Sequence, residues 1–598
     1  MTAAPQPQET PLLLDRLLAN FETRATRTPG ETVIVAGERT ISAGDLDARA
    51  NRLARHLQSL GVCPGVYVGI GLGRSVELIV ALLAVVKAGG AYVPLDPAYP
   101  RERLDHMISA AGLKLVLTRP ELAGHFAATA VDVTDAALDE LPAAPVTSFA
   151  TPDDPLYAIF TSGSTGQPKA ASVFRKGFAN LLDWYLAELG ADNRSLVISS
   201  PSFDLTQKNF FAPLLGGGLL VLDEGTTYDI SRINGLIRSH GITLVNCTPS
   251  AFYPLVDADA AALASIRFAV LGGEPISIPR LRGWLESGIA EVVNTYGPTE
   301  CTDICAFHRL HRGNLDDFGF VPLGREIPNV SVTIRDEDLA TIPDGELGEL
   351  CIAGAGLGGG YLNDPERSAR SFALAGGIYR TGDLARRLPC GTLEFRGRAD
   401  HQVKVNGFRI ELGEIEIALG SHESVREAVV ISKDGRLIAH VQGTAADLKA
   451  HLATKLPAYM IPGEFVYRDG FPLTPNGKVD RLALAEEHRP HASSRSADGT
   501  ILERILALWG ELLDKEVTDP EANFFDLGGT SIHLAVMHVR LREMTGRDLA
   551  ITDLFARPSA KSLADFLSPQ AATTTSTAQD RARLQQAGLA RFRRPSPR

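Results

Sequence analysis

Cysteine is scarce in this sequence. Six cysteines are spread over 598 residues, and no two of them form a C-x-x-C pair. A disulfide framework needs a denser arrangement, so we do not expect one. Cys301 and Cys305 lie close together, but no neighbouring His or Cys group completes a zinc site. The cysteine content therefore fits a reducing compartment.

Basic clusters and long apolar runs are also lacking. The formal net charge is −12, and the densest basic region is six arginines in a polar C-terminal tail, so no nucleic-acid partner is expected. The longest apolar stretches, such as LIVALLAVV, are far shorter than a membrane span, and MTAAPQPQET has neither the basic start nor the apolar run of a signal peptide. We expect a cytoplasmic protein without a membrane partner.

The sequence does contain a regular alternation of short apolar runs and helical stretches. This alternation predicts an α/β protein with parallel sheets covered by helices. Continuous Val, Ile and Leu runs are typical of buried parallel strands. The predicted strands are 32–36, 67–70, 114–117, 196–199, 243–246, 268–271 and 291–294.

Changes in composition divide the chain into five parts. A large α/β region covers 11–399, and a smaller α/β unit rich in charge and glycine covers 400–485. Residues 486–499 form a polar linker. Residues 500–568 contain three helical patterns, ILERILALWGELLD, SIHLAVMHVRLREM and SAKSLADFL, which predict a small helical bundle. The tail 569–598 is poor in apolar residues and is expected to be disordered.

A glycine- and serine-rich segment, TSGSTGQPK at 161–169, follows the apolar run LYAIF. Glycines let backbone N–H groups approach a polyphosphate, while hydroxyls and a lysine add donors. The spacing is not that of a G-x-x-x-x-G-K-[ST] loop. From these residues alone, a phosphate-binding loop and a plain surface turn both remain open.

Nine further segments occur in a characteristic order with this one. FTSGSTGQPKA resembles the phosphate loop of the adenylate-forming superfamily. The full set resembles a nonribosomal peptide synthetase adenylation domain fused to a peptidyl carrier protein, and it covers roughly residues 15–568. The other nine segments are VKAGGAYVPLDPAYP (86–100), SFDLT (202–206), NTYGPTE (294–300), GELGELCIAGAGLGGGYLN (345–363), YRTGDLA (379–385), GRADHQVKVNGFRIELGEIE (397–416), LPAYMIP (456–462), NGKVDR (476–481) and FFDLGGTSIHL (524–534).

This resemblance implies a fold and a two-step activity. The fold is a large multi-sheet adenylation subdomain, a small mobile α/β subdomain and a helical-bundle carrier domain. An α-amino acid is activated by ATP to aminoacyl-AMP and pyrophosphate, and is then transferred to a phosphopantetheine thiol on the chain's own carrier domain. The implied cofactors are ATP, Mg²⁺ and 4'-phosphopantetheine, and the implied pathway is nonribosomal peptide or related natural-product biosynthesis.

The resemblance also implies an ATP site and a metal ligand. Glu300 is the implied Mg²⁺ ligand, because a hard cation prefers carboxylate oxygen; a carboxylate that caps a Gly-Pro turn is the alternative. Tyr296 stacks on adenine, and Asp383 accepts hydrogen bonds from the ribose hydroxyls. The implied ATP-binding residues are Thr161, Ser162, Gly163, Ser164, Thr165, Gly166, Lys169, Gly273, Glu274, Asn294, Tyr296, Gly297, Thr299, Asp383 and Arg398.

Three further residues receive roles in the same way. Lys478 is the implied catalytic lysine, whose point charge suits a developing anion; without the resemblance it would read as a solvated turn lysine. Asp400 is the implied hinge, where the small subdomain changes orientation between the two steps. Ser531 is the implied phosphopantetheine attachment residue at a helix N-terminus, and a simple N-cap is the alternative.

The implied amino-acid pocket is polar. Asp204 is expected to pair with the substrate ammonium, a role that separates amino-acid activation from acyl activation. Lys208, Asn246 and Asp303 disfavour an apolar substrate, so a polar or charged side chain is expected. Asp303 either pairs with Lys208 or meets a cationic group of the substrate. The implied pocket residues are Asp204, Leu205, Lys208, Asn246, Val270, Gly272, Thr295, Asp303 and Ile304.

Two other functions stay open at this stage. One is an acyl-CoA-synthetase-like ligase, and the other is an inactive carrier scaffold. The sequence has no H-H-x-x-x-D-G condensation motif and no G-x-S-x-G thioesterase motif. We therefore expect a phosphopantetheinyl transferase and a downstream synthetase or tailoring enzyme as partners. The sequence does not tell whether an MbtH-like protein is needed, or name the amino acid.

Overall fold

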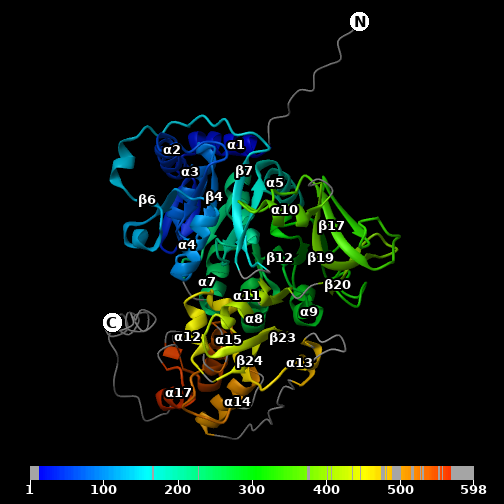
Figure 1. Ribbon diagram of the computed structural model, residues 1–598. Coiled ribbons are helices and arrows are strands. Elements are labelled where there is room, and N and C mark those ends of the chain that lie inside the picture. The colour runs from blue at the N-terminus through cyan, green and yellow to red at the C-terminus, as the bar shows by residue number, and fades with distance from the viewer. Residues whose placement is uncertain are drawn as a thin grey trace. The chain divides into compact units, whose positions relative to one another are not determined.

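The computed structural model forms two compact units (Figure 1). The first comprises Met1–Glu224, Ile233–Leu419 and Ala450–Met460, and the second comprises Gly225–Arg232, Gly420–Lys449 and Ile461–Arg598. The residues that the structure describes are 13–163, 167–225, 228–373, 377–399, 402–405, 407–433, 435–444, 446–472, 479, 481–487, 500–513, 517–524, 527, 529, 531–547, 549, 553–554 and 557–567.

A six-stranded sheet lies in the N-terminal part of the first unit. Its strands follow the order β6-β5-β3-β4-β7-β8 and are parallel except for the pair β7 and β8. In this sheet β7 and β8 flank the glycine-rich loop, so the sheet fixes both ends of that loop. The bounds are β3 (Tyr67–Ile70), β4 (Ala91–Pro94), β5 (Leu115–Thr118), β6 (Thr129–Asp132), β7 (Pro155–Thr161) and β8 (Lys169–Phe174).

A second sheet of the first unit contains nine of the described strands, in the order β15-β14-β13-β12-β11-β9-β10-β1-β2. The run from β13 to β1 is parallel, and antiparallel strands extend both edges. The bounds are β1 (Thr32–Ala36), β2 (Arg39–Ser42), β9 (Arg194–Val197), β10 (Leu219–Leu222), β11 (Leu244–Cys247), β12 (Phe268–Gly272), β13 (Glu291–Tyr296), β14 (Ala306–Leu310) and β15 (Arg325–Glu326).

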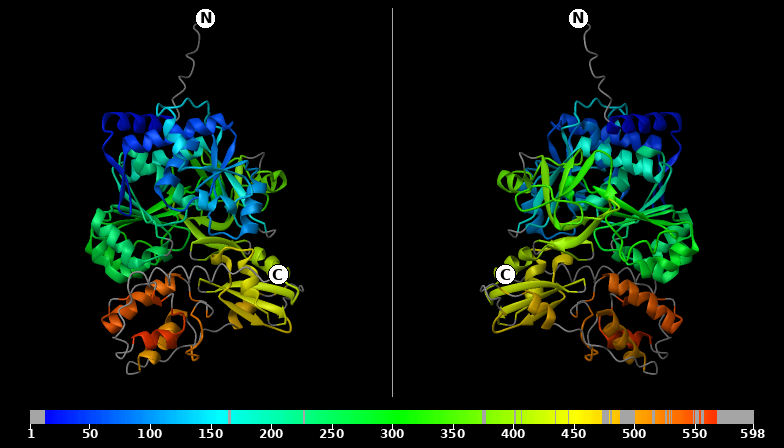
Figure 2. Two further views of the ribbon diagram at one scale, coloured as in Figure 1. Left: turned by 90° about the vertical axis from the view of Figure 1, so that its left-hand side faces the viewer. Right: turned by 90° about the vertical axis from the view of Figure 1, so that its right-hand side faces the viewer.

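Helices form a layer between these two sheets. Helix α5 packs on β7 and β8, α6 packs on β9, β10 and β11, and the two helices contact each other, with the rings of Phe178 and Phe211 5.4 Å apart. The dark-blue α1 contacts both helices on the outside of the unit (Figure 2). The bounds of the helices up to residue 371 are α1 (Leu13–Arg27), α2 (Ala43–Ser59), α3 (Val76–Ala88), α4 (Arg101–Ala110), α5 (Arg175–Leu189), α6 (Asp204–Gly216), α7 (Ile230–His240), α8 (Pro249–Asp259), α9 (Ile278–Ser287) and α10 (Pro365–Ser371).

Helix α3 is surrounded by other elements, which explains why most of its residues are apolar. It packs on α2 and on strands β3 and β4, and all its residues are buried. The Ser75 hydroxyl caps its first turn by accepting from the Leu78 N–H, and Gly89 ends it in the left-handed conformation at φ 91°. The apolar run LIVALLAVV is therefore a core helix. No helix of the described residues is long and apolar enough to cross a membrane.

The third sheet of the first unit is antiparallel and is drawn in green on the right of Figure 1. Its order is β16-β17-β19-β18, with β20 paired to β19. The sequence pattern did not predict this antiparallel sheet. The bounds are β16 (Val330–Arg335), β17 (Gly348–Gly354), β18 (Phe372–Ala373), β19 (Ile378–Arg387) and β20 (Leu393–Arg398).

The first unit also contains a hairpin that follows these sheets in the chain. Strands β21 (Gln402–Val405) and β22 (Phe408–Glu411) pair antiparallel, and α11 (Leu412–Gly420) follows directly. The short helix η5 (Ala458–Met460) belongs to the same unit. These segments bring residues from the predicted small subdomain beside the two large sheets.

The second unit holds a three-stranded sheet and the C-terminal helices. Strands β23 and β24 are antiparallel, and β25 pairs parallel to β24. Leu484 packs with Val429, Ile431 and Ile438 in a small core. The bounds are β23 (Val425–Lys433), β24 (Arg436–Gly443), β25 (Glu464–Tyr467), α13 (Arg481–Glu487), α14 (Ile501–Leu513), α15 (Ser531–Thr545) and α17 (Ala560–Leu567). The residues of α12 (Leu448–Ala453) are divided between the two units.

Candidate functional site

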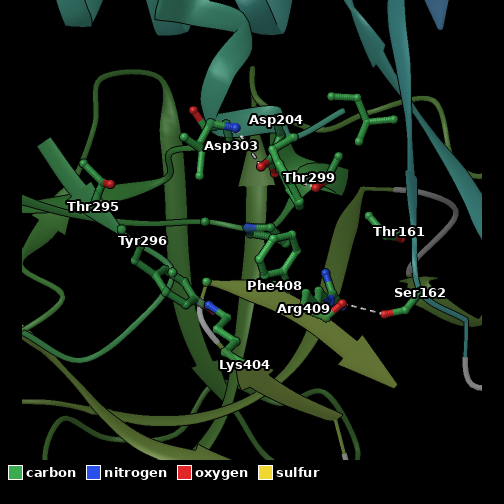
Figure 3. Close-up of a pocket in the computed structure, with 18 of the residues that line it drawn as sticks. Thr161, Ser162, Asp204, Thr295, Tyr296, Thr299, Asp303, Lys404, Phe408 and Arg409 are labelled. Carbon is green, nitrogen blue, oxygen red and sulfur yellow. Dashed lines mark hydrogen bonds between the residues drawn. The ribbon is translucent and has the colours of Figure 1, made fainter. Parts of the chain in front are cut away.

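A pocket of the first unit lies at the carboxyl ends of three parallel strands. Asn246 is on β11, Gly272 ends β12, and Thr295 and Tyr296 end β13. The register pairs Gly272 with Thr295, so these residues share one edge of the sheet. Ligand sites in open α/β sheets lie at this edge. Figure 3 shows the pocket, with Asp204 from α6 and Phe408 and Arg409 from β22 on its walls.

Many of the predicted site residues meet in this pocket. Its wall contains Thr161, Ser162, Asp204, Leu205, Asn246, Gly272, Gly273, Thr295, Tyr296, Gly297, Thr299, Asp303, Asp383 and Arg398. They come from segments that lie far apart in the sequence. The structure therefore brings the predicted nucleotide residues and the predicted amino-acid residues into one cavity.

Asp204 is the first residue of α6. Its Oδ1 accepts a 2.7 Å hydrogen bond from the Leu205 N–H, and its Oδ2 accepts one from the Thr299 hydroxyl (Figure 3). A carboxylate is favoured at a helix N-terminus. Among the ion pairs of the described chain, none includes Asp204, although it lies on a pocket wall.

The neighbouring carboxylate, Asp303, has a cationic partner. It forms an ion pair with Lys208 of α6, and both side chains are buried. Burial, with a smaller contribution from Asp204, raises the pKa of Asp303 to about 6, although Lys208 acts in the opposite direction. Of the two alternatives that the sequence left for Asp303, the structure shows the pair with Lys208.

The backbone around Asp303 is unusual. Thr302 and Asp303 have φ values of 61° and 67°, in the left-handed region that side chains seldom adopt. A Cβ on Gly297 would lie 2.1 Å from the Asp303 carbonyl oxygen. Glycine at 297 is therefore required by the turn that aims Asp303 at Lys208. Such outliers often mark ligand sites.

Further polar side chains lie near Asp303, of which Asn246 is on the pocket wall and the predicted pocket residue Lys208 is not. The Asn246 amide donates a 3.1 Å hydrogen bond to Oδ1 of Asn209, and Lys208 donates 3.0 Å to the Leu205 carbonyl. Asn246 and Lys208 are both buried. Buried groups of this kind favour a ligand that can form hydrogen bonds.

At the other end of the pocket, Asp383 joins two predicted nucleotide residues. Its carboxylate accepts hydrogen bonds from the Tyr296 hydroxyl and from the Arg398 guanidinium. Burial raises the pKa of Tyr296 well above its ordinary value, and the Asp383 charge adds to this effect. A ribose hydroxyl that binds Asp383 would share the carboxylate with these partners.

Glu300 lies fully buried beside this pocket. Its Oε1 accepts 2.7 Å from the Tyr361 hydroxyl and lies 3.2 Å from Lys169 Nζ, while Oε2 accepts 3.0 Å from Arg409. Burial raises the pKa of the Glu300 carboxyl, but Arg409, Lys169 and Tyr361 outweigh burial and hold it well below its usual range. Glu300 is thus ionised and surrounded by positive charge.

These contacts test whether Glu300 can hold Mg²⁺ in this arrangement. Both of its oxygens are engaged, and two cations already neutralise it. Among the described residues, no group of three or more His, Cys, Asp or Glu side chains could hold a metal ion. The arrangement described here does not fit Mg²⁺ at Glu300.

The start of the glycine-rich loop is held by residues from the hairpin. The Ser162 hydroxyl donates 2.8 Å to the Arg409 carbonyl (Figure 3) and accepts 3.1 Å from the Glu411 N–H. The Gly163 N–H donates 3.2 Å to Oε2 of Glu414. A Cβ at 163 would lie 2.0 Å from the Gln167 carbonyl oxygen, so glycine is required there. Ser164, Thr165 and Gly166 lie outside the described residues.

Several wall residues were not among the predicted ATP-binding or amino-acid residues, although the resemblance implies that the segment near Phe408 lines the pantetheine tunnel. Phe408 stacks on Tyr459 with ring centroids 3.9 Å apart, and Phe203 meets Phe408 edge-on at 4.8 Å. Lys404 Nζ lies 5.8 Å from the Tyr296 ring centroid. All of these residues lie inside segments quoted above for the resemblance. The signal in the sequence for these residues is that they belong to these motifs. Their residue types alone do not indicate a role in the site.

Other predicted residues lie away from the wall of the pocket. The Glu274 carboxylate accepts hydrogen bonds from the Ser250 N–H and hydroxyl at the start of α8, and Asn294 donates 2.7 Å to the Pro322 carbonyl. Val270 and Ile304 are buried in the apolar core. In this structure Glu274 therefore caps a helix, while the other three support the strands and turns around the pocket.

The described part of the carrier region contains three of the predicted helices. Trp509 of α14 packs on Phe524 at 4.9 Å and donates a 2.9 Å hydrogen bond to Met537 of α15. A Cβ on Gly529 would lie 2.3 Å from the Phe524 ring. Ser531 is the first residue of α15, and its side chain lies outside the description. Asp400 and Lys478 also lie outside the described residues.

Three protein families match successive parts of the chain. The AMP-binding enzyme family matches residues 21–362, more than half of the chain. The AMP-binding enzyme C-terminal domain matches 414–478, and the phosphopantetheine attachment site matches 503–567.

Curated relatives and solved structures match over most of the chain. Malpibaldin synthetase from Mortierella alpina is 36% identical over 92% of this chain and 10% of its own length. Tyrocidine synthase 1 from Brevibacillus parabrevis is 36% identical over 92% of this chain and 52% of its own. The chain thus spans from about a tenth to about half of these relatives. The structure of holo-PA1221, an NRPS protein containing adenylation and PCP domains, is 30% identical with a TM-score of 0.79, covering 92% of this chain and 96% of that one.

Proposed function

Because the chain belongs to the family of AMP-binding enzymes and carries a phosphopantetheine attachment domain, we propose that it activates an α-amino acid and loads it onto its own carrier domain. The amino-acid carboxylate attacks the α-phosphate of ATP, which yields aminoacyl-AMP and releases pyrophosphate. Ser531 would hold phosphopantetheine, whose thiol would accept the aminoacyl group as a thioester with release of AMP.

The observation that carries this proposal is the Asp204 carboxylate. It lies in the same pocket as Tyr296 and Asp383, and no ion pair of the described chain includes it. A partly buried carboxylate on a pocket wall is stabilised by a cation. The ammonium of an α-amino acid supplies that charge, whereas an acyl substrate without an ammonium does not.

We assign the remaining roles on the same basis. Tyr296 packs against adenine, Asp383 accepts from the ribose, and the 161–169 loop holds the leaving phosphates through backbone N–H groups. Lys478 stabilises the charge that develops on the α-phosphate. Mg²⁺ is the usual cofactor of such enzymes, and the chemistry it would supply is neutralisation of phosphate charge.

We further propose a polar side chain on the amino acid. Asn246 and Asp303 line one end of the pocket, and the buried Lys208, which does not line it, pairs with Asp303. These groups already have partners within the protein, and a polar side chain could form further hydrogen bonds with the polar wall that an apolar side chain could not. The carrier domain implies a phosphopantetheinyl transferase as one partner, and we propose a downstream synthetase or tailoring enzyme as acceptor of the thioester.

The test is amino-acid-dependent ATP–pyrophosphate exchange across polar, acidic, basic and apolar amino acids, with and without an MbtH-like protein. One strong polar substrate, lost in Lys478→Ala, supports both proposals. Ser531→Ala should keep exchange but lose covalent loading, which separates the two steps. A strong apolar substrate contradicts only the pocket proposal. Absence of exchange under every condition contradicts the proposed function and favours an inactive scaffold.

A further inference from the structure

Asn209, a buried residue of α6, sets the direction of the hydrogen bonds at the amino-acid end of the pocket. A backbone carbonyl only accepts hydrogen bonds, so an amide that bonds to one turns its nitrogen toward it. The Asn209 Nδ2 donates 3.1 Å to the Leu205 carbonyl in this way. Its Oδ1 lies on the opposite side of the amide, where it accepts a 3.5 Å hydrogen bond from the Tyr185 hydroxyl.

The orientation of Asn209 determines that of Asn246 on β11. Because Asn209 presents its Oδ1, Asn246 offers its amide nitrogen, and Nδ2 donates 3.1 Å to that oxygen. Asn246 is also on the pocket wall. Its Oδ1, at the other end of the amide, therefore supplies the cavity with a hydrogen-bond acceptor.

The ion pair of Lys208 and Asp303 supplies a second acceptor. Lys208 donates 3.0 Å to the Leu205 carbonyl and pairs with Oδ2 of Asp303. Its side chain is only 1% exposed and does not line the pocket. Asp303 does line the pocket (Figure 3), and a carboxylate keeps free lone pairs when one oxygen is engaged. The cation is thus turned into the protein, while its partner carboxylate is presented to the cavity.

Thr295, at the end of β13, adds a third acceptor to this part of the wall (Figure 3). Its hydroxyl donates 3.4 Å to the Leu271 carbonyl, so the oxygen keeps lone pairs for a ligand. Asn246, Asp303 and Thr295 all present acceptors, while their own donors and those of Lys208 are used within the protein. A ligand group that donates hydrogen bonds matches this wall, and a group that only accepts them does not.

Charge narrows the ligand group further. Burial, and to a smaller extent Asp204, already hold the pKa of Asp303 above its ordinary value, so a side-chain carboxylate beside these two anions is unfavourable. A cationic side chain is opposed by Lys208, which already neutralises Asp303. The cations on the pocket wall belong instead to the nucleotide end, and they are Lys404, Arg398 and Arg409.

We propose that the pocket selects an amino acid whose uncharged side chain ends in a hydrogen-bond donor, a carboxamide or a hydroxyl, and that Asp303 rejects the corresponding acid. The inference rests on the proposed function, which places the substrate ammonium at Asp204. The side-chain N–H or O–H then donates to Oδ1 of Asp303 or of Asn246. Asn209 is a positioning residue, since it turns the Asn246 oxygen toward the cavity.

The test compares amino acids of nearly equal shape in ATP–pyrophosphate exchange by the full wild-type chain. Asparagine is paired with aspartate, glutamine with glutamate, and threonine with valine. We expect kcat/KM to favour the amide over its acid by about a hundredfold, because the acid loses a hydrogen bond and adds a repelled charge. Threonine should exceed valine by about tenfold, as for one hydrogen bond. Lysine and ornithine should be poorer substrates than the better amide.

Asp303→Asn tests the residue that carries the selection. Asparagine tolerates the left-handed backbone at this position, removes the anion and turns a donor toward the cavity. The ratio of amide to acid should fall at least about tenfold, whereas general damage to the fold would lower both rates and leave their ratio unchanged. Asn209→Leu frees the Asn246 amide to reverse and should lower the ratio by a smaller factor. Asp338→Asn removes an exposed carboxylate that is not on the pocket wall and should keep the wild-type ratio.

An acidic, cationic or apolar amino acid as the best wild-type substrate overturns the inference but leaves the proposed function in place. An unchanged ratio of amide to acid in Asp303→Asn also overturns it. The comparison of paired amino acids in wild type stands even where a variant does not fold. A failure of the proposed function would instead appear as a wild-type chain that shows no exchange with any amino acid.

Discussion

The two ends of the pocket differ in which segments form their contacts. At the proposed amino-acid end, α6 contacts the turn that follows β13, whereas at the proposed phosphate end the glycine-rich loop contacts the much later hairpin and α11. Asp204 meets Thr299, and Lys208 meets Asp303, each pair 95 residues apart and inside the same sheet-and-helix layer. Ser162 and Gly163 instead meet Arg409 and Glu414, 247 and 251 residues away.

This difference separates a half of the pocket built within the sheet-and-helix layer from a half that depends on a later hairpin. The amino-acid end is fixed because its residues belong to α6 and to the turns that follow β13. The phosphate end depends on a hairpin and α11, which follow the predicted hinge at Asp400. Substitutions at the first end should change which substrate binds, and those at the second should change which step proceeds.

The largest effect should follow Asp204→Asn. The substrate ammonium would lose its charged partner, and breaking a buried pair costs about 3–5 kcal/mol. We expect kcat/KM for amino-acid-dependent exchange to fall by roughly two to three orders of magnitude, with the KM for ATP little changed. Asp303→Asn is the control and should lose much less exchange. Equal losses in both variants would show that Asp204 has no special role.

The next effect concerns stability rather than turnover. Lys208→Met leaves the buried Asp303 carboxylate without its cationic partner, so the free energy of unfolding at neutral pH should fall by about 3 kcal/mol. The double variant Lys208→Met/Asp303→Asn removes both charges and should recover part of this loss. Denaturant unfolding followed by tryptophan fluorescence measures both. A double variant less stable than the single would contradict a compensating pair.

A smaller effect is expected at the nucleotide end from Arg398→Gln. Asp383 would lose the guanidinium that orients it, so the KM for ATP should rise about tenfold, as for loss of one charge-assisted hydrogen bond. The KM for the amino acid should stay the same. Arg396→Gln changes a half-exposed arginine on the same strand, β20, and should leave both values unchanged. A matching rise in both KM values would mean that the two ends are not independent.

The smallest effect is a pH dependence from Asp303. Its pKa of about 6 lies above the ordinary carboxyl value, so folding favours the protonated form. The stabilisation from this group is complete below about pH 4 and is lost as pH rises through about 6. The melting temperature of wild type, taken relative to that of Asp303→Asn, should therefore fall by about 2 °C between pH 4 and pH 7. A flat difference would place the Asp303 pKa at its ordinary value.

Motif order predicted more of this protein than periodicity did. The expected arrangement of an adenylation domain followed by a carrier domain is confirmed by the family matches. Strands 32–36 and 67–70 match β1 and β3, whereas 196–199 is displaced from β9 (Arg194–Val197). An apolar run shows that a strand is buried, but its ends depend on pairing partners far along the chain.

Contacts between distant segments could not be predicted in this way. The sequence marked Glu300 as acidic and Arg409 as part of a motif, but their pairing depends on how the hairpin meets the sheets. Phe203, Phe408 and Tyr459 likewise form one aromatic cluster from three segments. The Lys208–Asp303 pair was foreseen as one of two alternatives. The individual roles of the site residues, the carrier serine and the domain boundaries remain predictions.

The left-handed backbone at Asp303 restricts how this pocket can be redesigned. A library that randomises the substrate pocket would treat position 303 like any other, yet its φ of 67° suits Asn, Asp and Gly far better than branched or aromatic residues. Most library members altered at 303 would therefore be lost to misfolding. Diversity is better introduced at 246 and 295, which are wall positions on strands β11 and β13, where the backbone accepts most side chains.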